Sequence, residues 1–307
     1  MIHDILIIGG GPAGLTAAVY ARRAGKDALV LEKDAFGGQI TNSPAVENIP
    51  GFEHVTGTEF ADRLTEQALA QGAVLESADV VSLSRGEEDG IFTARSAEGE
   101  EYRGRAVILA AGTKHRTLGL PGEEDFIGNG ISFCAVCDGA CCKDRPVAVV
   151  GGGNSALQEA LLLSELCEQV TVIQNLPVLT GEKPLCDALM EKENVDILFS
   201  SLLIAYEGDP ATGLTGVLVR HANGLTERVR ADMVFLAVGL EPQNGPFADL
   251  APLDLRGYAD AGEDCMTATP GLFAAGDCRR KKIRQVTTAA ADGAVAALAA
   301  CDYLDGR

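Results

Sequence analysis

Two cysteines and an aspartate form the short segment of this chain whose residue types most clearly suggest chemistry. Cys134 and Cys137 stand in "FCAVCDG" at a C-x-x-C spacing, and Asp138 follows directly. Such a pair can cycle between a dithiol and a disulfide. Zinc would need two more ligands, and the nearby Cys141 and Cys142 are spaced too tightly for familiar structural sites. We therefore predict a redox pair and no metal, with Asp138 as a general acid or base or, alternatively, as a helix cap.

A glycine-rich turn near the N-terminus predicts a dinucleotide site. Gly9 permits a tight turn, Gly11 lets the backbone approach a pyrophosphate, and Gly14 lets a helix pack closely on the preceding strand. Glu32 ends the next apolar segment, where its carboxylate can accept hydrogen bonds from a ribose diol. The alternative is a glycine turn that binds no ligand.

A second cofactor signal lies near the C-terminus, in "GLFAAGDCRRKKIRQVTTAAADGA". Asp277 ends a predicted strand, where it can meet a ribityl hydroxyl or a pyrophosphate-linked group. Gln285 and Val286 open a predicted helix whose N–H groups would stabilise negative charge on a reduced flavin. An ordinary strand-to-helix corner is the alternative, but together with the first glycine turn this segment favours FAD.

These motifs require elements that position them, and an internal repeat supplies those elements. Residues 4–33 and 145–174 share one layout of apolar strand, glycine turn, helix and second strand. Fully apolar strands are typical of a parallel sheet buried on both faces. The repeat predicts an α/β fold with two doubly wound Rossmann-like domains, the second inserted in the first. We place the FAD-binding domain at 1–114 and 243–307, and a NAD(P)-binding-like domain with the C-x-x-C pair at 115–242.

Composition limits the partners and the compartment. The chain has 307 residues and a net charge of −19, so its overall field will not attract nucleic acid or an anionic membrane. We find no apolar run of the ~20 residues that a membrane span needs, and the start resembles a first strand, unlike a signal peptide. We therefore expect a cytoplasmic protein whose nine cysteines are not a disulfide framework.

The chain resembles the low-molecular-weight thioredoxin reductases over nearly its full length. The resemblance rests on "GGGPAG", "GGQI", "ENIPGF", "AAGT", "CAVCDG", "GGGNSA", "GLFAAGD" and "RQVTTAAADG". It implies a homodimer with FAD in the first domain and a dithiol in the second, which reduces thioredoxin or a similar dithiol protein. It also implies that the smaller domain swings between flavin reduction and thioredoxin reduction. It also implies that Cys137 faces the flavin, that Cys134 attacks the partner disulfide and that Asp138 donates a proton.

The motifs and the resemblance together define the predicted FAD-binding residues. Among them, Gln39, Asn48 and Thr113 match family positions that line the flavin. The full set is Gly9, Gly11, Pro12, Ala13, Gly14, Glu32, Lys33, Gly38, Gln39, Asn48, Val80, Ala111, Gly112, Thr113, Gly276, Asp277, Arg284, Gln285 and Val286.

The second glycine turn departs from the family pattern. NADPH-using members carry a His-Arg-Arg run after the following strand, because the 2′-phosphate needs cationic partners. Here that position reads "QNLP", Gln174 to Pro177, with neither basic residue nor acid. Losing two or three charge-assisted bonds of ~1.5–3 kcal/mol each would weaken NADPH binding by several orders of magnitude. Gly151, Gly153 and Ala156 then mark either a remaining dinucleotide site or helix packing alone.

The electron donor follows from this departure. Members of the family without the arginine run take electrons from reduced ferredoxin or hold a second flavin. Ferredoxin is acidic, so we predict that it docks on the basic segment Cys278–Arg284, on Lys114–Arg116 or on both. A solvated loop that balances pyrophosphate charge is the alternative for the first segment. The other functional readings are an NAD(P)H-dependent thioredoxin reductase, a two-FAD oxidoreductase and a flavin-binding redox sensor without turnover.

Overall fold

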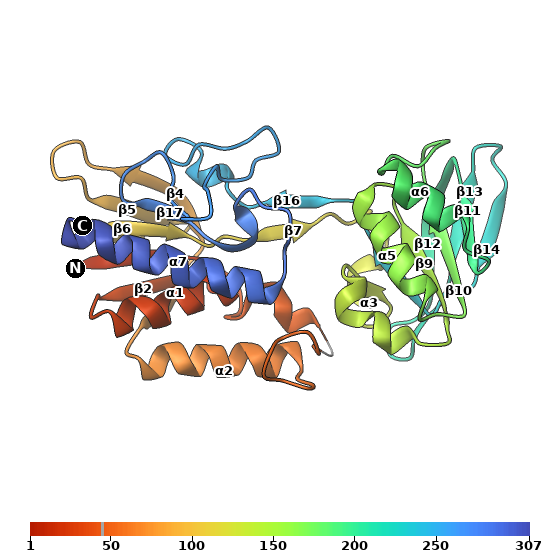
Figure 1. Cartoon of the computed structure of the whole chain (residues 1–307), viewed down its shortest axis with the longest axis horizontal. Coiled ribbons are helices and arrows are strands. Elements are labelled where there is room, and N and C mark those ends of the chain that lie inside the picture. The colour runs from red at the N-terminus through yellow and green to blue at the C-terminus, as the bar shows by residue number, and fades with distance from the viewer. Residues whose placement is uncertain (44–45) are drawn as a thin grey trace. The chain divides into compact units, whose positions relative to one another are not determined.

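The computed structural model describes residues 1–43 and 46–307 as an α/β fold (Figure 1). The chain divides into two compact units. The first consists of Met1–Thr41, Ile49–Lys114 and Glu241–Arg307, and the second of His115–Leu240 with the described part of Asn42–Asn48. The chain passes between them in β7 (Thr113–His115) and β16 (Leu240–Pro242), which pair in a two-stranded sheet. The second unit is therefore inserted in the first.

The first unit is built on a seven-stranded sheet. Its strand order is β3 (Val74–Ser77), β2 (Ala28–Glu32), β1 (Ile2–Ile8), β6 (Glu101–Leu109), β5 (Phe92–Ser96) and β4 (Val80–Arg85), and β17 (Leu272–Ala274) also pairs with β6. The strands β1, β2, β3, β6 and β17 pair in parallel, while β4, β5 and β6 are antiparallel neighbours. Ile5 and Ile7 face one apolar core and Leu6 and Ile8 the other, because alternate side chains of a strand point to opposite faces.

Small residues allow the helices of this unit to approach one another closely. The helices are α1 (Pro12–Arg23), α2 (Gly57–Ala70) and α7 (Val286–Asp305), and Figure 1 shows them gathered on one side of the sheet. A Cβ atom on Gly14 would overlap the Gly9 carbonyl oxygen, and one on Gly293 would overlap the Ala13 carbonyl oxygen. Glycine at these positions therefore sets the distance from α1 to its turn and from α7 to α1.

The second unit holds a parallel sheet between a helix and a smaller sheet. The parallel strands lie in the order β11 (Val195–Leu198), β10 (Gln169–Ile173), β9 (Pro146–Val150), β15 (Met233–Leu236) and β8 (Ile131–Ser132). Val147 and Val149 pack in one apolar cluster with α5 (Asn154–Ser164), and Ala148 and Val150 pack in another with β13. The antiparallel sheet consists of β12 (Ser201–Asp209), β13 (Gly213–His221) and β14 (Thr226–Val229).

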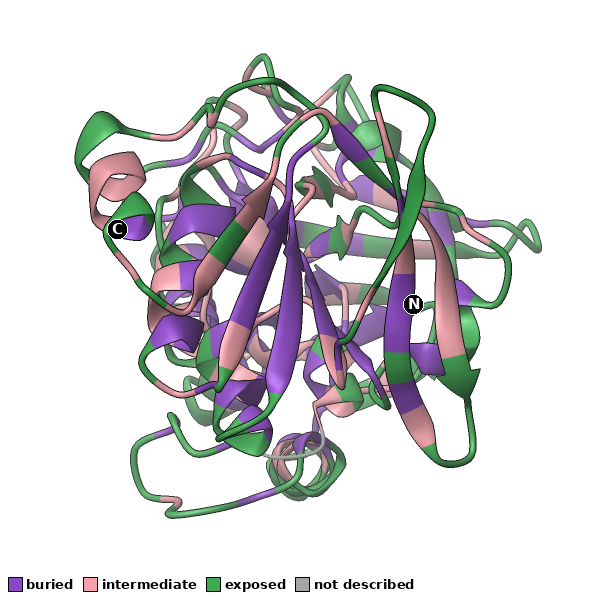
Figure 2. Cartoon of the chain, turned by 90° about the vertical axis from the view of Figure 1, so that its right-hand side faces the viewer, coloured by how far each residue is buried: buried purple, intermediate pink, exposed green. Residues whose placement is uncertain are grey.

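Short helices complete both units. They are α3 (Glu123–Phe126), α4 (Ala135–Asp138) and α6 (Lys183–Met190), with 3-10 turns η1 (Gly38–Asn42), η2 (Gly139–Cys142), η3 (Gly245–Phe247) and η4 (Gly276–Cys278). Figure 2 shows strands that are buried through the interior and loops that are largely exposed. Within the described ranges, no helix is both long enough and apolar enough to cross a bilayer.

The predicted fold class is confirmed. The segments β1–α1–β2 and β9–α5–β10 repeat one arrangement, with a glycine turn between the first strand and the helix of each. In both, the two strands are parallel neighbours, as a βαβ unit requires. The repeat that was visible in the sequence therefore corresponds to two Rossmann-like halves.

Candidate active site

The C-x-x-C pair forms a disulfide in the second unit. The Cα atoms of Cys134 and Cys137 lie 5.3 Å apart. Cys134 is the N-cap residue of α4, and its carbonyl oxygen accepts hydrogen bonds from the N–H groups of Cys137 and Asp138 at 3.1 and 3.0 Å. Both cysteines are half-buried, and the intervening Val136 is 56% exposed. The pair is thus held by one helical turn with its central residue at the surface.

The remaining cysteines do not extend this site. All seven are free thiols, of which Cys141 is exposed and most of the others are buried. In the described part of the chain, no three His, Cys, Asp or Glu side chains gather in a way that could hold a metal ion. Burial raises the pKa of Cys142 to about 12 and that of Cys167 to about 11, so these thiols are unreactive.

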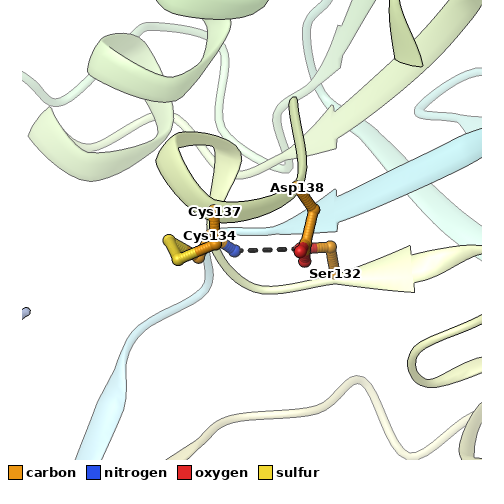
Figure 3. Close-up of a disulfide and its surroundings, with 4 residues drawn as sticks. All are labelled: Ser132, Cys134, Cys137 and Asp138. Atoms are coloured by element: carbon orange, nitrogen blue, oxygen red, sulfur yellow. Dashed lines mark hydrogen bonds between the residues drawn. A yellow bond between two sulfur atoms is a disulfide. The ribbon is translucent and has the colours of Figure 1, made fainter. Parts of the chain in front are cut away.

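Asp138 directly follows Cys137 in the chain, and it is 7% exposed. Its Oδ2 atom accepts a hydrogen bond from the Ser132 hydroxyl at 2.5 Å, and the Ser132 Oγ accepts one from the Cys134 N–H at 3.1 Å (Figure 3). Its Oδ1 atom is buried and has no hydrogen-bond partner among the described residues. Burial raises the pKa of Asp138, and the hydrogen bond from Ser132 opposes that rise. Asp138 is therefore a carboxyl group whose proton is held more tightly than usual.

Two points about this site differ from the sequence analysis. The alternative of Asp138 as a helix cap is wrong, because the Asp138 side chain caps neither α4 nor η2. Ser132 was not predicted at all. Its place two residues before Cys134 is its only sequence signal, and the contact with Asp138 depends on the turn of α4.

The first glycine turn forms a backbone cradle in the first unit. Gly9 has φ +109°, a conformation that favours glycine, and Gly11 is the N-cap of α1. Glu32 is 8% exposed, and its two carboxylate oxygens accept from the N–H groups of Gly10 at 2.5 Å and Asp34 at 2.9 Å. Each oxygen retains a lone pair, so the carboxylate can still accept from a ribose hydroxyl.

Asp277 presents an unsatisfied oxygen in the same unit. The strand β17 ends at Ala274, so Asp277 lies in the following η4 and does not end the strand as predicted. Its Oδ1 atom is buried without a hydrogen-bond partner among the described residues. Burial raises the pKa of Asp277, while Lys281 and Arg284 act in the opposite direction. A buried polar atom in a native fold normally has a partner. A hydroxyl donor such as a ribityl group would satisfy it, so the residues present fit FAD.

Several of the other predicted cofactor residues have clear places in the structure. Gln285 is the N-cap of α7 and forms a capping box with Thr288, so the helix begins at Val286 as predicted. The Gln39 side-chain amide donates to the Thr113 carbonyl oxygen, which joins two predicted flavin-lining residues. Of three further residues in the predicted set, Lys33 is exposed, Val80 packs in an apolar core, and Asn48 belongs to the second compact unit.

The structure leaves only part of the predicted basic docking surface at Cys278–Arg284 exposed. Arg279 is 3% exposed and contacts the Asp292 carboxylate through Nε at 3.2 Å and Nη2 at 2.9 Å. The Lys281 Nζ donates to the same carboxylate at 2.9 Å, and so does the Gly276 N–H at 3.0 Å. Arg284 stacks over the Tyr258 ring at 4.1 Å. These basic residues neutralise a buried carboxylate or pack inward, because the loop folds over α7.

The second basic cluster also carries less charge than the sequence suggests. His115 stacks on Phe133 with 4.6 Å between ring centroids, and burial lowers the pKa of His115 to about 4. It is therefore neutral at pH 7. The predicted docking residues that remain exposed and charged are Lys114, Arg116, Arg280 and Lys282, of which Arg280 pairs with Asp260 at 2.9 Å.

Charge reversal in the basic loop should affect stability much more at the buried Lys281 than at the exposed Arg280. Lys281→Glu should destabilise the protein by about 3–5 kcal/mol, because it breaks a buried ion network and places two carboxylates together. Arg280→Glu should change stability by less than about 1 kcal/mol, because its ion pair is solvent-exposed. Urea unfolding of both variants measures the difference, and equal effects would contradict the assignment of Lys281 to the interior.

The second glycine turn is closed by its own neighbouring residues. Gln174 is 3% exposed, its side chain lies against Gly152, and its Nε2 donates to the Val178 carbonyl oxygen at 2.9 Å. The N–H groups of Thr180 and Gly181 donate to the Gly152 carbonyl oxygen at 2.7 and 3.1 Å. The Gln174 amide is therefore engaged inside its own loop.

An open hollow of about 500 Å³ lies just beyond the end of β10, where Asn175 lines it. Asn175, Leu202, Arg220 and His221 are among the residues that line it. Arg220 is exposed and lies in β13. It therefore supplies a positive charge that the residues after β10, Gln174 to Pro177, do not contain. The hollow therefore offers the Arg220 guanidinium group beyond the end of β10.

Comparison with known proteins shows similarity along the whole chain. A family model described as pyridine nucleotide-disulphide oxidoreductase matches residues 3–293. The thioredoxin reductase of Listeria monocytogenes is 39% identical over 304 residues, covering 99% of this chain and 94% of that protein. The thioredoxin reductase of Bacillus subtilis is 37% identical over 304 residues, covering 99% of this chain and 95% of that protein.

A solved structure shows the same fold. The crystal structure of thioredoxin reductase from Streptococcus pyogenes superposes with a TM-score of 0.92 at 35% sequence identity. The match covers 100% of this chain and 99% of that one. The similarity thus extends to both Rossmann-like units and includes the segment that carries the disulfide.

Proposed function

The chain belongs to the thioredoxin reductase family, flavoprotein disulfide reductases within the pyridine nucleotide-disulphide oxidoreductases, and from that premise we propose how its electrons travel. They pass through FAD and the Cys134–Cys137 pair to thioredoxin or a similar dithiol protein, with reduced ferredoxin as the donor. The observation that carries the acceptor half is a half-buried disulfide next to a buried carboxyl group. As the family resemblance implies, the active form in this proposal is a homodimer.

The first unit supplies the residues for FAD. Gly9, Gly11 and the N-terminus of α1 would hold the pyrophosphate, and Glu32 would accept from the ribose. The unpartnered Oδ1 of Asp277 would accept from a hydroxyl group of the ribityl chain. When bound, FAD supplies the two electrons that reduce the Cys134–Cys137 disulfide. The protein contributes the fixed cradle, so little conformational freedom is lost on binding.

The dithiol then reduces its partner in two exchange steps. The Cys134 thiolate attacks one partner sulfur, which forms a mixed disulfide and releases the other partner sulfur as a thiolate. That thiolate takes a proton from Asp138. The Cys137 thiolate next attacks the Cys134 sulfur, which restores the disulfide and releases the second partner sulfur, protonated by solvent. Two electrons have moved from the enzyme dithiol to the partner.

The donor half of the proposal rests on the end of β10. A 2′-phosphate needs charge-assisted hydrogen bonds, and Gln174 to Pro177 provide none. The buried Gln174 amide is already bonded to the Val178 carbonyl oxygen, so it is not available to a ligand. Ferredoxin requires only electron transfer and an exposed basic surface, for which Lys114, Arg280 and Lys282 remain exposed. For a nicotinamide donor, the neighbouring hollow offers the guanidinium group of Arg220.

The donor is tested by anaerobic bleaching of the flavin absorbance with excess NADPH, NADH or reduced ferredoxin. We expect reduced ferredoxin to bleach the flavin promptly and both nicotinamides to act more slowly by several orders of magnitude. Prompt bleaching by NADPH would overturn the donor proposal. The variant Arg220→Gln then locates the phosphate site: an NADPH rate that falls about tenfold or more would place the 2′-phosphate at the hollow lined by Arg220.

Two other functions give different results in simple assays. One FAD per chain is expected after denaturation, and two per chain would favour a two-flavin oxidoreductase. Turnover with thioredoxin and a reducing donor is expected, and its absence in a protein that binds FAD normally would favour a redox sensor. The native mass, measured by light scattering, should correspond to two chains.

A further inference from the structure

We propose that Ser132 is the positioning residue for proton transfer at the Cys134–Cys137 pair. Its hydroxyl group holds one oxygen of Asp138 and accepts the Cys134 backbone N–H, so that the second Asp138 oxygen is left to exchange a proton with sulfur. The inference rests on the proposed function, in which Asp138 donates that proton. It assigns Ser132 no direct contact with the reacting sulfur atoms.

Ser132 forms hydrogen bonds with residues at both ends of α4, Cys134 and Asp138. Ser132 ends β8, pairs with Phe235 of β15 and is 4% exposed, so it is anchored in the parallel sheet. Its Oγ accepts from the Cys134 N–H at 3.1 Å, at the start of α4, and donates to Asp138 Oδ2 at 2.5 Å, at the end of α4. One side chain thus fixes the first cysteine and the carboxyl group relative to the same strand (Figure 3).

The two oxygens of Asp138 are in different situations. Oδ2 accepts from Ser132, whereas Oδ1 is buried without a hydrogen-bond partner among the described residues. A buried carboxyl oxygen without a partner is costly, so its site normally provides a donor in some state of the protein. The structure holds the disulfide, in which neither sulfur carries a proton. Reduction would create two thiol groups, one of them on Cys137 directly before Asp138, and in this proposal they supply the donor for Oδ1.

Ser132 has a measurable influence on the pKa of Asp138. Burial raises the pKa of Asp138, and the donated Ser132 hydrogen bond stabilises the ionised form and opposes that rise. Three of the titratable groups near Asp138 have a pKa that favours the uncharged form at pH 7, whereas Glu47 acts on the Cys141 thiol as a charged group. Burial raises the pKa of the Cys141 and Cys142 thiols in η2, and burial raises the pKa of Glu159, on the packed helix α5, to about 8.

Arg145 is the cation that acts on the Cys141 and Cys142 thiols, and it is not among the causes of the Asp138 shift. Removing the Ser132 hydroxyl should therefore raise the pKa of Asp138 further. Protonated Asp138 is the form that donates, so activity is lost as the pH rises through this pKa. Without the hydroxyl, that loss should occur at higher pH.

The test uses single-turnover exchange between the pre-reduced holoprotein and oxidised thioredoxin, so that no electron donor is required. We expect Ser132→Ala to move the alkaline limb of the pH–rate profile upward by about one unit or more. At pH values below the alkaline limb, the exchange rate should fall about tenfold, because the Asp138 carboxyl group is no longer held in one orientation. Ser132→Thr keeps a hydroxyl group and should restore the wild-type limb.

Two controls keep the proposal testable. Ser164 is also a buried hydroxyl in the second unit, donating to the Leu161 carbonyl oxygen at 2.7 Å, so Ser164→Ala should leave the limb in place. Hydrogen exchange at the Cys134 amide should speed up in Ser132→Ala and not in Ser164→Ala. This measurement also covers the case in which the exchange reaction of Ser132→Ala is too slow to follow.

The outcomes separate this inference from the proposed function. Asp138→Asn should abolish the limb altogether. If it does so while Ser132→Ala leaves the limb at the wild-type pH, the role of Ser132 is wrong and Asp138 remains the proton donor. If Asp138→Asn retains the limb, Asp138 is not the proton donor, and that step of the proposed function fails.

Discussion

Replacing Cys134 with serine should reduce thioredoxin turnover by at least about three orders of magnitude while the flavin is still reduced by its donor. The reacting group is a thiolate, and a serine hydroxyl does not ionise near neutral pH. In the structure Cys134 is half-buried at the start of α4, next to the exposed Val136. Turnover is measured with oxidised thioredoxin, and flavin reduction by anaerobic absorbance in the same preparation.

The matched control is Cys141→Ser. Cys141 is an exposed free thiol in η2, directly after the redox segment, and its pKa is raised by burial and by Asp138. Turnover should therefore stay within about twofold of wild type, since the thiol has no part in the exchange. If Cys134→Ser kept thioredoxin turnover and Cys137→Ser lost it, the roles of the two cysteines would be reversed.

The substitution Gly11→Ala should weaken FAD binding roughly tenfold to a hundredfold with little effect on the fold. Gly11 has φ −77°, and an added Cβ would lie 3.8 Å from the Gly37 carbonyl oxygen, so the protein itself has room for alanine. Its cost in the apoprotein is about 1 kcal/mol or less, because alanine caps a helix less well than glycine. A bound pyrophosphate would meet the new methyl group, at a cost of about 1–3 kcal/mol.

Gly153→Ala is the corresponding change in the second unit. Gly153 has φ −87° and is the N-cap of α5, and an added Cβ would lie 3.9 Å from Thr180 Oγ1. We expect unchanged flavin content and unchanged ferredoxin-driven turnover. FAD affinity is measured by fluorescence titration of the apoproteins, with thermal unfolding as the check on folding. A Gly11→Ala protein that binds FAD as tightly as wild type would contradict the cradle, and a loss of turnover in Gly153→Ala would show that the second turn holds a nucleotide.

The sequence was sufficient for the fold class and for the local chemistry of the redox pair. The apolar strands, the glycine turns at Gly9 and Gly151 and the spacing of Cys134 and Cys137 are patterns within a few residues. Such patterns are decided by backbone sterics and by the geometry of one strand or one helical turn. The βαβ units and the disulfide follow directly from them, and the structure has both.

Local sequence patterns could not predict whether a charged side chain points into the protein or toward solvent. "CRRKKIR" reads as an exposed basic segment, yet Arg279 and Lys281 point inward to Asp292, which lies on a helix that begins beyond the segment. The contact of Ser132 with Asp138 depends in the same way on the turn between β8 and α4. Composition gives the numbers of charged and hydroxyl groups but not the partners that they contact.

Only the packing of distant elements determines which charged and hydroxyl groups are buried. A buried charge must find its partner across space, and a surface charge need not. The sequence therefore determined that this protein has two Rossmann-like units and a redox-active pair. The tertiary structure decided that Asp292 accepts from the N–H group of Gly276, next to Asp277 in the chain. It also decided that the Ser132 hydroxyl bonds one oxygen of Asp138, while the other has no hydrogen-bond partner among the described residues.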